Sequence, residues 1–171
     1  MSMKKAVVLD TTAIFTGILN SIPFNVEAYI HSSVIPEVKD RDSKFRLEVA
    51  LQSNRVRVLN PPKHTVDKVK VISTTLGEEL NLSQTDTEVL ALALYLHERG
   101  YDVIVFSDDY SVQNLCKKLN IKFNPVKTIG IKRLRRYIYK CTACGYTTEQ
   151  LPADKKCPIC GMELRRKLSR S

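Results

Sequence analysis

Two pairs of cysteines near the C-terminal end constrain the fold of this chain more than any other feature. Cys141 and Cys144 form one C-x-x-C pair and Cys157 and Cys160 the other; each pair is followed by a glycine, and 12 residues separate them. Two sulfurs at this spacing can face one ion from a tight turn, and four thiolates suit tetrahedral zinc. Because such a site has no open coordination position, we expect one structural Zn²⁺ in a small four-cysteine zinc ribbon over residues 137–164.

The basic charge of the chain lies in the same C-terminal segment. Residues 127–171 hold 12 basic and 3 acidic residues, and residues 1–126 hold 15 of each, so the formal net charge of +9 lies entirely after residue 126. A local excess of this kind favours contact with nucleic acid phosphates. We expect RNA-binding residues in a basic linker (127–136), in the ribbon and in a basic tail (165–171), namely Lys132, Arg133, Arg135, Arg136, Lys140, Arg165, Arg166 and Lys167.

Three tyrosines interleave with these basic residues. Tyr137 and Tyr139 are candidates for stacking on unpaired bases, as is Tyr146. The alternative is that aromatic residues around a ribbon form its small core, and the sequence leaves both interpretations open.

Length and hydropathy exclude several classes of protein. The chain of 171 residues suits one ordinary domain plus a small appendage. No apolar run approaches the ~20 residues of a membrane span, and the opening MSMKKAVVLD has too short an apolar stretch for a signal peptide. We therefore expect a cytoplasmic protein without a membrane partner. No Walker A or G-x-G-x-x-G sequence points to a nucleotide cofactor.

Strands and helices alternate through residues 1–126. Buried strands are expected over 6–10 and within DVIVFSDD (102–109), an alternating strand over 56–60, a last strand over 121–126, and a further extended stretch within 31–40. Helices are expected over 11–19, from Pro36 to about Gln52, over 65–76, within 82–100 and over 110–120. This order predicts an α/β domain of three layers around a central, mostly parallel sheet.

Four acidic residues recur at the ends of these elements. Asp10 ends the first strand, Glu37 is expected to open a helix, Asp86 lies in the first turn of the long helix, and Asp109 follows a strand. Strand carboxyl ends and helix N-termini share one edge of an open α/β sheet, so the carboxylates can converge there. Carboxylates that lie close together repel one another, so their ionised forms need a compensating cation, and oxygen ligands favour Mg²⁺ or Mn²⁺. Taken singly, Glu37 and Asp86 are equally explained as helix caps.

The segments around these acids resemble those of PIN-domain nucleases. The matching segments are VVLDTTAIF, VIPEV, LSQTDTEVLALAL and FSDDYSVQN. The segment SDDYSVQN together with the CTACG and CPICG ribbon is similar to a family within them, the Nin-one-binding endonucleases that mature small-subunit rRNA in archaea and eukaryotes. The compact chain, without long insertions, resembles the archaeal members.

The resemblance implies an activity and a role for each residue. It implies endonucleolytic cleavage of single-stranded precursor RNA that forms the 3′ end of small-subunit rRNA, with the pre-ribosomal small subunit as partner. Asp10, Glu37, Asp86 and Asp109 would be the catalytic acids, with Asp10, Asp86 and Asp109 holding one or two Mg²⁺ or Mn²⁺ ions. Ser107 would supply a hydroxyl, and the adjacent Asp108 is an alternative to Asp109. Homodimer formation stays open.

The expected reaction is phosphodiester hydrolysis that leaves 5′-phosphate and 3′-hydroxyl ends, because a divalent ion activates water and stabilises phosphoryl oxygens. Two other functions compete with this one. The first is a toxin-type PIN ribonuclease acting on tRNA or mRNA, disfavoured by the expectation that such chains end near residue 126. The second is a non-catalytic RNA-binding assembly factor whose acids hold no metal.

Overall fold

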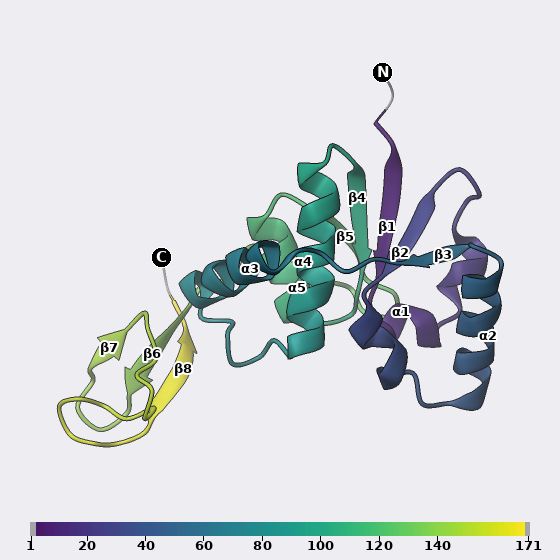
Figure 1. The fold of residues 1–171 in the computed structure, drawn as a ribbon. Helices are drawn as coiled ribbons and strands as arrows, with labels where there is room; N and C mark the ends of the chain where they lie inside the picture. Colours follow the sequence, from purple (N-terminus) through teal and green to yellow (C-terminus); the bar gives the residue numbers. More distant parts are fainter. Residues whose placement is uncertain (1–2, 170–171) are drawn as a thin grey trace.

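The computed structural model describes residues 3–169 and shows two sheets (Figure 1). The strands are β1 (Lys5–Leu9), β2 (Glu27–Ile30), β3 (Val56–Val58), β4 (Asp102–Phe106), β5 (Lys122–Asn124), β6 (Tyr137–Cys141), β7 (Thr147–Thr148) and β8 (Leu164–Leu168). The α-helices are α1 (Thr11–Phe15), α2 (Arg41–Gln52), α3 (Lys63–Leu76), α4 (Gln84–Glu98) and α5 (Tyr110–Lys118). There are also two 3-10 helices, η1 (Ile18–Ser21) and η2 (Ser32–Glu37), and an isolated antiparallel bridge between Lys156 and Glu163.

The larger sheet confirms the expected α/β class. Its strand order is β3-β2-β1-β4-β5, and all four pairings are parallel. The order reverses direction beside β1, so the carboxyl ends of β1 and β4 meet at the switch point where open α/β sheets bind ligands. Leu9 pairs with Phe106 there, which places the segments that follow both strands next to each other.

Helices cover both faces of this sheet, with α1 and α2 on one side and α3, α4 and α5 on the other (Figure 1). Helix α4 packs against α3, α5, β1 and β4. Because it is surrounded, its buried residues are spread around the helix and include Val89, Leu90, Leu92 and Leu96. This rigid centre supports the helix N-terminus that carries Asp86.

The first expected helix is shorter than the range 11–19. Helix α1 ends at Phe15, and Gly17 adopts a left-handed conformation with φ of +70°. An L-residue with a side chain adopts that conformation at a cost, so glycine marks the break and the chain continues as η1.

The prediction for residues 31–52 was wrong in two respects. The strand β2 lies earlier, and Ser32–Glu37 forms a 3-10 helix that contains Pro36 near its end. The helix that follows starts at Arg41, because the side chain of Asp40 caps it by accepting a 2.8 Å bond from the Ser43 amide. Glu37 therefore ends a 3-10 helix and does not open α2.

The smaller sheet, with order β7-β6-β8, is antiparallel and forms the ribbon. Strand β8 pairs with β6 as far as Leu168, opposite Tyr137. Residues 165–168 therefore belong to the ribbon sheet and not to a basic tail, so the predicted boundary between ribbon and tail lies too early in the sequence. No helix among the described residues is long and apolar enough to cross a membrane.

Candidate functional site

Asp10 is the most buried of the candidate acids, with 4% of its surface exposed. It follows β1 directly, and its two carboxylate oxygens accept bonds of 2.6 Å from the Thr11 amide and 2.7 Å from the Ser107 hydroxyl. The pKa of Asp10 is raised to about 6, chiefly by burial and to a smaller extent by the negative charges of Asp86 and Asp109, against the opposing effect of the two hydrogen bonds. The carboxylate is therefore held in place but disfavoured in its ionised form.

Asp86 occupies the third position of a capping box at the start of α4. Its amide donates to the Ser83 hydroxyl at 3.0 Å, and its carboxylate accepts from the Ser83 amide at 2.8 Å. Burial raises the pKa of Asp86, with further contributions from Asp109 and Glu37. The capping explanation is thus confirmed for this residue. The same carboxylate is nevertheless close enough to Asp109 and Glu37 for their charges to raise its pKa, so a cap and a member of an acidic group are compatible roles.

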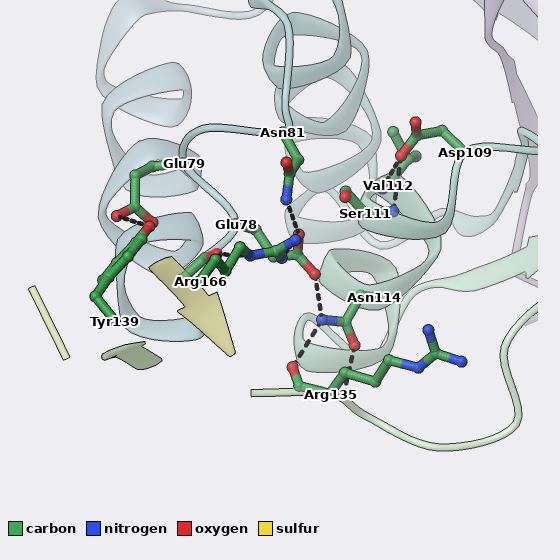
Figure 2. Close-up of polar contacts among 11 residues, drawn as sticks. Glu78, Glu79, Asn81, Asp109, Ser111, Val112, Asn114, Arg135, Tyr139 and Arg166 are labelled. Atoms are coloured by element: carbon green, nitrogen blue, oxygen red, sulfur yellow. Dashed lines mark hydrogen bonds and ion pairs between the residues drawn. The ribbon is translucent and has the colours of Figure 1, made fainter. Parts of the chain in front are cut away.

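The structure separates the neighbouring residues Asp108 and Asp109. Asp109 caps α5, and its Oδ1 accepts bonds from the amides of Ser111 and Val112 at 2.7 and 3.0 Å (Figure 2). Its own amide donates to Ser107 Oγ at 3.1 Å, so the serine hydroxyl bridges Asp109 and Asp10.

Asp108 binds elsewhere, through amide donors of residues 126–128 at 2.8 to 3.1 Å. Although partial burial opposes them, these amides lower the pKa of Asp108. Its carboxylate holds the start of the linker, which favours Asp109 as the member of the acidic group.

Glu37 reaches the group through Thr11, a residue that the sequence did not single out. Thr11 donates its hydroxyl to Glu37 Oε2 at 2.6 Å and its amide to Asp10 Oδ1. A threonine directly after a strand-terminal acid is the signal that could have found it. Glu37 is exposed, in contrast to the buried Asp10.

The four acids form an electrostatically coupled group without a protein cation. None of the ion pairs within residues 3–169 involves Asp10, Glu37, Asp86 or Asp109. No three acids in this range bring carboxylate oxygens within 4.8 Å of one another, so they do not make a closed ligand cage. Carboxylate oxygens are the donor type that Mg²⁺ and Mn²⁺ prefer, and a closed cage is not required, because Mg²⁺ usually keeps several waters and takes only one or two protein carboxylates.

The four cysteines do form a compact cluster that could hold a metal ion. Their sulfurs all lie within 4.8 Å of one another, with 3.4 Å between Cys141 and Cys160 and 3.5 Å between Cys144 and Cys157. A tetrahedral ion with metal–sulfur bonds of about 2.3 Å requires separations of roughly 3.8 Å. The two C-x-x-C turns are equivalent: the amides of Gly145 and Gly161 each donate to the carbonyl of the first cysteine, at 3.1 and 2.9 Å.

The predicted RNA-binding residues fall into two groups. Four of them, Lys132, Arg133, Arg135 and Arg136, line a hollow of about 630 Å³ between the linker and the end of β8. Lys140, Arg165 and Lys167 border a second hollow on the ribbon.

Four of the predicted RNA-binding side chains have partners within the protein: Arg136, which pairs with Glu149 at 2.6 Å, and Arg166, Tyr137 and Tyr139. Arg166 pairs with the buried carboxylate of Glu78, and its guanidinium lies 3.5 Å from the centre of the Tyr137 ring. Tyr139 is 1% exposed in the core of the ribbon and donates to Glu79 at 2.7 Å (Figure 2). The core explanation therefore holds for Tyr139.

Comparison with known proteins identifies the class. Residues 7–96 match the model described as "PIN domain of ribonuclease", and residues 139–164 match that of the rubredoxin-like domain of rubrerythrin. The chain belongs to the PIN-domain ribonucleases.

Several relatives carry the name Endoribonuclease Nob1, and two of them illustrate the match. The protein from Pyrococcus abyssi is 37% identical, over 96% of this chain and 95% of its own length. The protein from Methanothermobacter thermautotrophicus is 36% identical, over 99% of this chain and 95% of its own length. The resemblance inferred from the four acidic segments and the ribbon is confirmed at the level of the family.

A third relative bears on the competing ribonuclease. Ribonuclease VapC1 from Thermoplasma acidophilum is 36% identical over 93% of this chain and 76% of its own length. An alignment of that extent continues well past residue 126. The length of the chain therefore does not distinguish relatives named Nob1 from a relative named VapC1, and the expectation that it would was wrong.

Proposed function

We propose that this chain is a metal-dependent endoribonuclease that cuts single-stranded precursor RNA and forms the 3′ end of small-subunit rRNA. The observation that carries the proposal is the buried Asp10 carboxylate at the switch point of the sheet, coupled to Asp86 and Asp109 without a protein cation. The relatives named Endoribonuclease Nob1, which match nearly the full chain, support the substrate assignment.

Asp10 and Asp109 would hold a Mg²⁺ or Mn²⁺ ion, with Asp86 and Glu37 completing its shell or that of a second ion. A bound divalent ion supplies activation of water and neutralisation of the charge that develops on phosphoryl oxygens. The protein's own contribution is orientation. Ser107 bridges Asp10 and Asp109, and the Ser111 and Val112 amides fix Asp109 Oδ1. This arrangement directs the two carboxylates while Thr11 holds Glu37.

We infer that the ribbon holds one Zn²⁺ through Cys141, Cys144, Cys157 and Cys160. Four thiolates fill a tetrahedral shell, so the ion would stabilise the fold and take no part in the reaction. Ribbon and linker would then make the phosphate contacts, because the basic side chains that line the two hollows lie there: Lys132, Arg133, Arg135, Arg136, Lys140, Arg165 and Lys167. Of these, Arg136 also pairs with Glu149 on the surface of the ribbon. A cytoplasmic location and association with the pre-ribosomal small subunit belong to the same proposal, whereas homodimer formation is left to measurement of the mass in solution.

The test of the reaction is the chemistry of the product ends. Hydrolysis with water as nucleophile leaves a 5′-phosphate and a 3′-hydroxyl, which a ligase and a 5′-phosphate-dependent exonuclease detect. Detection of a 2′,3′-cyclic phosphate would contradict the mechanism, since that product requires attack by the ribose 2′-hydroxyl.

The second candidate is a ribonuclease acting on another RNA, favoured by the similarity to Ribonuclease VapC1. The two functions differ in substrate. Equal amounts of a small-subunit rRNA 3′-end precursor and of total tRNA, offered together, should give a single mapped cut in the precursor under our proposal. Preferential cleavage of tRNA would support the alternative.

A further inference from the structure

The loop between α3 and α4, residues 77–82, is where the ribbon meets the PIN domain. Gly77 adopts a φ of +65°, and a Cβ atom built on it would lie 2.7 Å from the backbone oxygen of Tyr137 in β6. Only glycine permits this close approach of loop and ribbon. Next to it, Glu79 accepts a 2.7 Å bond from Tyr139, so the loop and β6 are joined at more than one point.

Glu78 in this loop is 2% exposed, and its carboxylate joins the ribbon to the catalytic domain. One oxygen accepts a 2.8 Å bond from Asn114 of α5, and the other pairs with Arg166 of β8 (Figure 2). Arg166 also donates from Nε to the Gly77 carbonyl at 2.7 Å and stacks over Tyr137. Within residues 3–169, Arg166 is the cation that forms an ion pair with Glu78.

Asn114 connects this pair to the linker as well. Its Oδ1 accepts from the Arg135 amide at 2.7 Å, and its Nδ2 donates to the Arg135 carbonyl at 2.7 Å (Figure 2). Asn114 is 1% exposed, and these bonds satisfy both polar ends of its side-chain amide within the protein. The linker is thereby fixed to α5 at the point where α5 contacts Glu78.

The same network continues to two of the candidate acids. Helix α5, which carries Asn114, starts at its cap Asp109. The backbone oxygen of Glu78 accepts from the amides of Asn81 and Leu82 at 2.9 and 3.2 Å, forming the turn that leads into the Ser83–Asp86 capping box. Glu78 thus bonds to the helix of Asp109 through its side chain and to the entry of the Asp86 helix through its backbone.

We propose that Glu78, neutralised by Arg166, is a positioning residue that fixes the Asp86 and Asp109 helices relative to each other, so that ribbon docking sets the rate of RNA cleavage. This inference rests on the proposed function for its catalytic consequence. Its structural part stands on the contacts alone. A buried carboxylate that loses its cation is strongly disfavoured, so removal of Arg166 displaces Glu78 from Asn114.

The test compares Arg166→Ala with Arg165→Ala, the neighbouring residue on the same strand. Both variants remove one positive charge, but Arg165 is exposed and lines the ribbon hollow. Arg166→Ala should lower the single-turnover cleavage rate at saturating RNA about tenfold or more, because small displacements of catalytic groups cost up to ~10²-fold. Arg165→Ala should weaken RNA affinity, because Arg165 belongs to the proposed RNA interface. Arg57→Ala, which breaks an exposed ion pair with Glu27 on the PIN domain, is the control that should leave the rate unchanged.

A double variant separates charge burial from RNA contact. Glu78→Gln keeps an oxygen that accepts from Asn114 and removes the charge that Arg166 neutralises. The pair Glu78→Gln with Arg166→Ala should therefore recover the saturating rate to within about threefold of the wild type, since no unpaired buried charge remains. An unchanged rate in Arg166→Ala, or no recovery in the double variant, would overturn the proposal.

Amide NMR shifts give a readout that does not depend on cleavage. The Ser111 and Val112 amides, which donate to Asp109, should shift in Arg166→Ala and return in the double variant, and they should stay in place in Arg165→Ala. Unmoved amides in Arg166→Ala would refute positioning even if its activity fell. A wild type that cleaves no RNA would refute the proposed function, and the amide shifts would still decide the positioning of Asp109. Thermal melting checks folding, and Arg166→Gln, which also removes the charge but keeps a polar side chain, replaces Arg166→Ala if that variant is unfolded.

Discussion

Asp10 illustrates how a single residue can reduce stability and still be suited to a metal site. Burial raises its pKa to about 6, so the folded protein binds its proton more tightly than the unfolded chain does. Stability therefore falls as the pH rises from the unfolded pKa of 3.8 through the folded value. A divalent cation that binds the folded carboxylate reverses this penalty by mass action.

Replacing Asp10 with Asn should stabilise the protein in EDTA. Above pH 6 the gain should approach about 3 kcal/mol, the equivalent of a pKa difference of roughly two units, and it should shrink as the pH falls towards 4. Urea unfolding at several pH values measures it. The control Asp108→Asn should destabilise the protein at pH 7, because amides lower the pKa of Asp108 and its ionised form is favoured in the fold. A pH-independent difference between wild type and Asp10→Asn would contradict the assignment.

The two adjacent acids give a second test at this scale. Asp109→Asn should reduce cleavage by at least about 10²-fold if its carboxylate contributes to the metal site. Asp108→Asn should retain most of the activity, because its carboxylate binds the amides of residues 126–128 instead. Cleavage rates of the two purified variants at saturating Mn²⁺ distinguish them. The reverse order would assign the catalytic role to Asp108.

At the scale of elements, local sequence signals predicted most of the catalytic domain. The apolar run before Asp10 and the alternation of strands and helices were sufficient for the sheet and its carboxyl edge. The position of Glu37 was missed because two competing start signals lie close together, Pro36 and the cap Asp40, and the capping bond to Ser43 decides between them.

The loop 77–82 could not be interpreted in this way. GEELN is a polar stretch of the kind that usually faces solvent, and nothing local marks Glu78 as buried. Its partners Asn114 and Arg166 are 36 and 88 residues away along the chain. Contacts at such separations depend on the docking of the ribbon, which neither periodicity nor residue spacing encodes.

Gly77→Ala tests this contact between elements. Both Gly77 and Gly100 have positive φ, but a Cβ on Gly100 would meet nothing within 4 Å. Gly100→Ala should therefore cost only backbone strain, about 1 kcal/mol, whereas Gly77→Ala should cost at least about 2 kcal/mol because the new methyl group collides with the ribbon backbone. Denaturant unfolding of both variants measures the difference, and equal losses would show that the contact contributes little.

At the scale of the whole molecule, charge is divided between two units that dock on each other. The acidic group lies in the neutral domain, and basic side chains line hollows on the linker and the ribbon. This division was predicted from the positions of the charges in the sequence. The use of Arg166 for docking was not, because an arginine in a basic stretch carries no signal that separates an internal ion pair from a phosphate contact.

The division of charge predicts how RNA binding depends on salt. Replacing both Lys132 and Arg133 with Gln should reduce the slope of log affinity against log salt concentration by about 1.4, since each phosphate contact on a single strand contributes roughly 0.7. The control Lys68→Gln removes a charge that is paired with Glu98 within the PIN domain, and it should leave the slope unchanged. Fluorescence anisotropy in EDTA measures both, and an unchanged slope in the first variant would remove the linker from the RNA interface.

The central claim is that the acidic group cuts RNA with the help of a divalent ion. The most direct measurement incubates the wild type with a small-subunit rRNA 3′-end precursor in Mn²⁺ and in EDTA, with Asp10→Asn as the matched variant, and maps the ends. We predict one cut at the mature 3′ end in Mn²⁺, none in EDTA and none with Asp10→Asn, although that variant still binds the RNA. Cleavage that persists in EDTA or in Asp10→Asn would contradict the account.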